Sequence, residues 1–213
     1  MSPATKVGLV AAPVVLLVAR FLLVPYWDEA DTYIDQVSED PARSDLGASL
    51  AIVGAFLLIH ASRGLADLVA DVRPRPAMLG HGLVVAGCVA MACISMAALV
   101  AGQAVRLGDE SAAIALWEQV WNTEKLWPIT AVHLGALGFI VLSVALFRAR
   151  AVHRGAAILL GVGGATLMTT AAGPIRPLLL IAASLAVAGF SWVAMSADRT
   201  TTVADGSRSE SLA

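Results

Sequence analysis

Apolar residues run along this chain in six long stretches, and polar or charged segments separate them. A helix needs roughly 20 mostly apolar residues to cross about 30 Å of hydrocarbon, and each stretch has close to that length. The pattern predicts an all-α protein, a polytopic bundle of six transmembrane helices that forms one domain over residues 1–197. The polar tail, residues 198–213, is expected to be disordered. The predicted spans are residues 7–26, 46–65, 77–101, 128–147, 155–172 and 178–195.

The first long polar segment, residues 27–45, follows the first span. It holds seven acidic residues and a single arginine, Arg43. Tyr33, Ile34 and Val37 within it fall at helical spacing. A short amphipathic helix on the outer face is therefore expected here.

The second long polar segment, Gly108–Pro128, carries three of the five tryptophans. Ile114, Trp117, Val120 and Trp121 recur at i, i+3, i+6 and i+7, which makes one apolar stripe. Asp109 and Glu110 suit a helix N-terminus. The segment is expected to form a helix that lies in the membrane interface, where tryptophan is favoured.

The distribution of arginine and lysine predicts the orientation. With a cytoplasmic N-terminus and six spans, nine basic residues fall on the inner side and five on the outer side. Basic residues in short loops favour the cytoplasm, and the tight turn with Arg148, Arg150 and Arg154 lies on that side. Both termini are therefore expected inside. The frequent Ala, Val, Leu and Arg residues are similar to the usage of high-GC bacteria, which indicates a bacterial plasma membrane.

The composition argues against a soluble domain and against a nucleic-acid-binding protein. Only 14% of the residues are charged, against about 25% in soluble domains. No basic stripe suits nucleic acid, and the two cysteines, Cys88 and Cys93, form no metal or disulfide pattern. The expected partners are membrane lipids, another membrane protein or a second copy of the chain, and no cofactor is predicted.

Arg20 is the most costly residue to place in a membrane. An arginine in the middle of a span costs about 2.5–3.5 kcal/mol unless it pairs or snorkels. In the predicted span it lies about 9 Å from the outer helix end. It either pairs inside the bundle, lining a pocket with Trp117, Trp121 and His133, or extends its guanidinium outward along the helix.

Two further histidines lie at similar depth on adjacent predicted spans. His60 is near the inner end of the second span, and His81 is near the inner end of the third. Facing histidines at equal depth would be able to ligate a haem. The alternative is that each hydrogen-bonds to backbone, hydroxyls or headgroups.

Small residues predict where helices approach one another in lipid. They recur every four residues in the second, third and fifth spans, and these faces are expected to be buried. The positions are Gly47, Ala51 and Ala55; Gly82, Ala86 and Ala90; and Ala157, Gly161, Ala165 and Thr169.

The plan of the chain, over about residues 7–197, resembles small six-span bacterial membrane proteins that belong to families of unknown function. The resemblance rests on Ala19–Leu22, where an arginine comes late in the first span, on Leu126–Pro128, and on the basic run Leu146–Arg154 before a small-residue helix. It implies the six-span fold and no particular reaction.

No motif of a nucleophilic or metal-dependent enzyme occurs in the sequence, and the predicted spans contain no acidic residue. Cation-coupled transport usually needs a carboxylate in the membrane. The favoured function is therefore a non-catalytic scaffold, accessory subunit or sensor. The alternatives are a small transporter or lipid-binding protein with an outer pocket near Arg20, and a haem-binding redox protein that uses His60 and His81.

Overall fold

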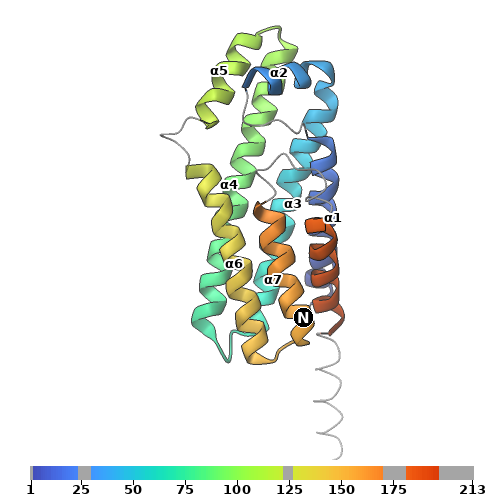
Figure 1. Ribbon diagram of the computed structural model, residues 1–213, viewed down its shortest axis with the longest axis vertical. Coiled ribbons are helices and arrows are strands. Elements are labelled where there is room, and N and C mark those ends of the chain that lie inside the picture. The colour runs from blue at the N-terminus through green and yellow to red at the C-terminus, as the bar shows by residue number, and fades with distance from the viewer. Residues whose placement is uncertain (1, 24–29, 122–126, 170–180, 197–213) are drawn as a thin grey trace, which may run out of the picture.

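The computed structural model describes residues 2–23, 30–121, 127–169 and 181–196, and every regular element in these ranges is an α-helix (Figure 1). The predicted all-α class is therefore confirmed. The predicted disordered tail lies outside the described residues. The helices are α1 (Pro3–Leu22), α2 (Ala30–Glu39), α3 (Pro41–Asp67), α4 (Pro74–Arg106), α5 (Glu110–Trp121), α6 (Trp127–Ala149), α7 (Arg154–Thr169) and a last helix, Ile181–Ser196.

Four described helices are long and apolar enough to cross a membrane: α1, α3, α4 and the Thr130–Ala149 part of α6. The fifth and sixth predicted spans also fall on apolar helices, α7 and Ile181–Ser196, which are shorter. A 16-residue helix rises only about 24 Å. Both of these predicted spans extend into residues 170–180, outside the described residues, so six crossings stay a prediction.

The lower part of the molecule in Figure 1 is a bundle of α1, α3, α4, α6, α7 and the last helix, which share one buried apolar cluster. Glycines let the backbones touch. A Cβ on Gly87 of α4 would lie 2.6 Å from the Cα of Gly135 on α6, and one on Gly163 would lie 2.6 Å from the Cα of Ala186. Large aliphatic side chains point outward instead, as lipid requires.

The structure confirms one of the three small-residue faces completely and the other two in part. Gly47, Ala51 and Ala55 of α3 are buried as expected. In α4, Ala90 is buried as expected, but Gly82 is exposed with nothing within 4 Å of its added Cβ, and Gly80 and Gly87 make the close contacts instead. The error has a simple cause, because a four-residue repeat drifts around a helix of 3.6 residues per turn. In α7, Ala157 and Gly161 are buried and Thr169 is exposed.

Above the bundle, the N-terminal end of α3 and the C-terminal end of α4 carry α2 and α5, and we call this region the head (Figure 1). Helix α4 has 33 residues, so it is about 50 Å long and exceeds the hydrocarbon thickness by about 20 Å. The head has its own apolar cluster, separate from that of the bundle. Its buried members are Ala19, Leu23, Tyr33, Ile34, Val37, Ala48, Ala51, Ala98, Ala101, Ala113 and Trp117.

Most helices begin or end a few residues away from the predicted bounds. Helix α1 ends at Leu22, four residues before the predicted Tyr26. Helix α3 ends at Asp67, and Pro74 begins α4. Proline suits a first helical turn because the N–H that it lacks would have no partner there.

Candidate functional site

The centre of the head is an aromatic stack between two helices that are far apart in the sequence. The Tyr33 ring of α2 lies on the Trp117 ring of α5, with centroids 4.0 Å apart and planes 10° apart. Both side chains are completely buried. The predicted amphipathic α2 is thus confirmed, with Tyr33, Ile34 and Val37 on its buried face.

The expected place of Trp117 needs correction. The stripe on α5 was expected to face the membrane interface, whereas Trp117 faces protein, because α5 packs on α4 and α2. A ring with 0% exposed surface lines no space that water can enter. Trp117 is therefore part of the packed head and not of a pocket wall.

An ion pair joins the N-terminal end of α3 to the C-terminal end of α4 beside this stack. Arg106 Nη2 lies 2.7 Å from Asp45 Oδ2, and Gln103 Nε2 donates to the same oxygen at 3.2 Å. Gly102 makes room for the carboxylate, since a Cβ there would lie 2.7 Å from Asp45 Oδ1. Arg106 is in the last turn of α4, where the helix dipole favours a cation.

Burial raises the pKa of the Tyr33 phenol to about 12. The negative charge of Asp45 acts in the same direction, and a hydrogen bond with Ser44 acts against it. The phenol is therefore neutral at physiological pH. A neutral ring suits its stacked and buried position, because an isolated phenolate would lose its hydration there.

Arg20 lies in the last turn of α1, because this helix ends earlier than predicted. The negative end of the helix dipole favours a cation at that position. Arg43 of α3 reaches the same end of α1, where its Nη2 donates to the Phe21 carbonyl at 2.9 Å. Arg20 is half-buried, and it lies at the end of α1 and not in the middle of the helix.

The structure describes three of the four side chains of the expected outer pocket, and their burial differs. Arg20 borders the head cluster through its neighbours Ala19 and Leu23, and Trp117 lies inside that cluster. His133 is exposed on α6. The side chain of Trp121 lies outside what the structure describes.

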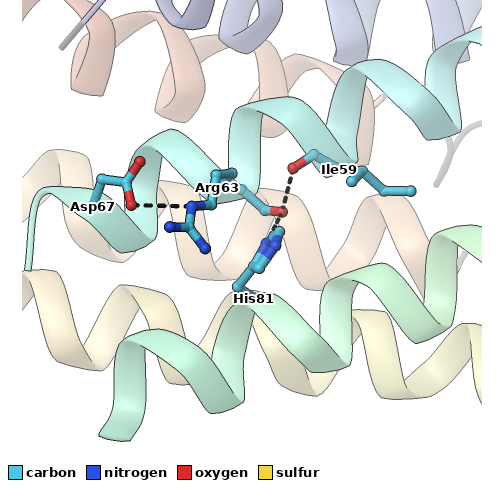
Figure 2. A network of polar contacts seen from close by, with 5 residues as sticks. Ile59, Arg63, Asp67 and His81 are labelled. Carbon is cyan, nitrogen blue, oxygen red and sulfur yellow. Dashed lines mark hydrogen bonds and ion pairs between the residues drawn. The ribbon is translucent and has the colours of Figure 1, made fainter. Parts of the chain in front are cut away.

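A second group of polar side chains lies near the other end of α3 and α4 (Figure 2). The Ser62 hydroxyl donates to the Ile59 carbonyl at 2.8 Å and lies 2.9 Å from His81 Nδ1. Because a hydroxyl has one proton, Ser62 accepts from His81 Nδ1–H, which leaves Nε2 as the unprotonated nitrogen of the neutral ring. Arg63 and Asp67, four residues apart on α3, form an ion pair with Nε and Oδ1 3.1 Å apart.

This Ser62–His81 contact is not arranged for nucleophilic catalysis. Ser62 is completely buried, and its proton goes to a backbone carbonyl and not to the imidazole. A nucleophile needs its base as the proton acceptor and room for a substrate. The contact therefore fastens α3 to α4.

The structure does not bring His60 and His81 together. His60 is exposed and faces α1, where a Cβ on Gly8 would lie 3.5 Å from His60 Cδ2. His81 contacts Ser62, which is two residues further along α3 and so about 200° around the helix from His60. The haem hypothesis gains no support from this geometry. Within the described ranges, no three His, Cys, Asp or Glu side chains group as metal ligands.

Sequence reasoning missed the Tyr33–Trp117 stack and the Asp45–Arg106 pair. A signal for the pair was present, since Asp45 precedes one predicted span and Arg106 follows the next, on the same side of the membrane. No comparable signal pairs two aromatic residues on separate polar segments. Compared with protein-family models, curated proteins and solved structures, the chain matches none of them.

Proposed function

We propose that this chain is a six-span protein of a bacterial plasma membrane, with both termini in the cytoplasm and the head outside. The marked N-terminus, the α3–α4 connection and the α6–α7 turn lie at one end of the bundle, opposite the head (Figure 1). That end carries six arginines in the described chain, and cytoplasmic ends favour basic residues. The six arginines are Arg63, Arg73, Arg75, Arg148, Arg150 and Arg154.

The role that fits this arrangement is a non-catalytic scaffold or accessory subunit that acts through its head. The observation that carries the proposal is the packing of the head, in which Trp117 and Tyr33 are fully buried and the Asp45–Arg106 pair ties two helix ends. Such a core makes a rigid surface, which suits binding of a partner with little ordering cost. The exposed side of the head is acidic. Its exposed carboxylates are Asp31, Asp35, Glu39, Asp40, Asp109, Glu110 and Glu118.

The inside of the bundle supports this choice over transport. Where the structure describes it, the buried polar groups of the bundle are hydroxyls, and Ser95 and Ser143 donate to the carbonyls of Met91 and Ala157. The Ser143 bond joins α6 to α7, whereas the Ser95 bond lies within α4. A proton or cation path would need titratable groups at that depth.

Cysteine labelling tests the orientation. In a chain with Cys88→Ala and Cys93→Ala, cysteines replace Asp31, Ser111 and Arg150 one at a time. The first two should react with an impermeant maleimide in intact cells, and the third only after lysis. Reaction of Arg150→Cys in intact cells, or of the other two only after lysis, would overturn the topology.

A photo-cross-linking side chain at Glu118 tests the scaffold role. Adducts with one specific protein are expected from Glu118. A matched probe at Arg75, at the end of the bundle opposite the head, should give none. Two results together would overturn the scaffold role: no adduct from a probe at Glu118, Asp35 or Glu110, and loss of uptake of a solute when the protein is deleted. The protein would then be a transporter.

A further inference from the structure

The turn between α6 and α7 concentrates positive charge that no described carboxylate neutralises. Arg148, Arg150 and Arg154 are exposed, and no ion pair joins them to any acidic residue in the described chain. The two described carboxylates at this end of the bundle, Asp67 and Asp71, belong to α3 and its following turn, and Asp67 is paired with Arg63. Among the residues that the structure describes, the turn is thus a cationic surface without an ion-pair partner.

Aromatic contacts hold this turn in one shape. The Arg154 guanidinium lies over the Phe147 ring, 5.6 Å from its centroid. The His153 ring stacks on Trp192 of the last helix, with centroids 5.1 Å apart, and its Nδ1 accepts from the Gly155 N–H at 3.2 Å. A fixed turn loses little entropy when it binds an anion.

The same surface continues into an apolar face. Phe147 and Trp192 each remain 38% exposed. Above Phe147, Ile140 and Val144 are exposed along α6 at spacings of three and four residues, and Ile158 is exposed on α7. Half-exposed aromatic rings between a cationic end and an aliphatic face are typical of the membrane–water interface. An amphiphile would therefore find a cationic surface for its headgroup and an aliphatic surface for its apolar chains.

We infer that the α6–α7 turn binds the headgroup of an anionic phospholipid in the cytoplasmic leaflet, with acyl chains along the exposed face of α6 and α7. Arg148, Arg150 and Arg154 contact the phosphate, and arginine suits a phosphate because its donors form a planar fork. The inference rests on the membrane placement proposed above. Free phosphate offers the same anionic oxygens, but only a lipid also covers the aliphatic side chains and the two aromatic rings.

Native mass spectrometry of the full chain in mild detergent tests the inference. Phosphatidylglycerol should bind in preference to phosphatidylcholine. A variant with Arg148→Gln, Arg150→Gln and Arg154→Gln should lose this preference, at about fivefold in affinity for each arginine. The variant with lysine at the same three positions keeps the charge and should retain most of the binding. Arg75→Gln, an exposed arginine at the same end, should leave the preference unchanged.

Three results would overturn the inference. They are equal binding of both lipids, an unchanged preference in the triple glutamine variant, and displacement of phosphatidylglycerol by inorganic phosphate at equal concentration. Detergent removes any effect of membrane orientation, so these outcomes are independent of the cysteine labelling. A chain that inserts as proposed and shows no lipid preference disproves only the headgroup site. A chain that fails to insert disproves the proposed membrane placement.

Discussion

The bundle and the head solve the same packing problem with opposite residues. In the bundle, helices meet at Gly87, Gly135 and Gly163, and aliphatic side chains point outward. In the head, the largest side chains, Trp117 and Tyr33, point inward, and carboxylates point outward. Lipid supplies no hydrophobic drive between helices, so close backbone contact stabilises the bundle. Water supplies that drive, so buried aromatic area stabilises the head.

Replacement of the head's central ring should have the largest effect. Trp117→Ala should lower the stability of the head by about 3–5 kcal/mol, because it leaves a cavity beneath Tyr33. A cysteine at Ala113, which is fully buried, should then react with a maleimide before the bundle unfolds. Leu107→Ala is the matched control, since Leu107 is 86% exposed. Protection of that cysteine in the Trp117→Ala chain would show that the stack does not hold the head.

A methyl group at a helix contact should break the bundle. A Cβ at Gly87 would lie 2.6 Å from backbone atoms of Gly135, which have little freedom to move. Gly87→Ala should therefore destabilise the bundle by about 3 kcal/mol, measured by unfolding in detergent. Gly82→Ala, on the same helix, has open space and should be neutral or stabilise by up to about 1 kcal/mol. Equal effects of the two changes would refute the packing described for α4 and α6.

High pH should loosen the head before the bundle. Because burial raises the pKa of Tyr33 to about 12, its neutral form stabilises the head fully below the unfolded-state pKa of about 10. This stability should fall as the pH rises from about 10 to about 12, by up to roughly 3 kcal/mol, since the unfolded chain loses its proton first. Tyr33→Phe should abolish this part of the pH dependence. The same alkaline loss in Tyr33→Phe would assign it to another group.

Loss of either ion pair should lower the stability less than the changes above, and the two pairs should differ in how much they contribute. Arg106→Gln leaves the partly buried Asp45 with only Gln103 and should cost about 1 kcal/mol. Arg63→Gln breaks the pair with Asp67, in which both side chains are more than half exposed, and should cost only a few tenths of a kcal/mol. Double-mutant cycles with Asp45→Asn and Asp67→Asn measure both couplings. A larger coupling for the exposed pair would reverse the comparison.

Much of the fold followed from hydropathy, and much of the site did not. The helices α1, α3, α4 and α6 coincide with predicted spans to within a few residues, and helical spacing alone predicted the apolar face of α2 that contains Tyr33. Spacing within one helix is a local property. The contact of Tyr33 with Trp117, and of Asp45 with Arg106, depends on how separate helices are placed, and no local pattern carries that information.

The sequence by itself determined that the chain is helical and apolar enough for a membrane, because length and hydropathy decide whether a segment prefers lipid to water. Tertiary structure alone decided that Trp117 faces inward, that Gly87 and not Gly82 meets a neighbouring helix, and that Arg20 lies at a helix end. The physical reason is that a helix has several apolar or small faces, and only the shape and position of its neighbours select the face that is buried.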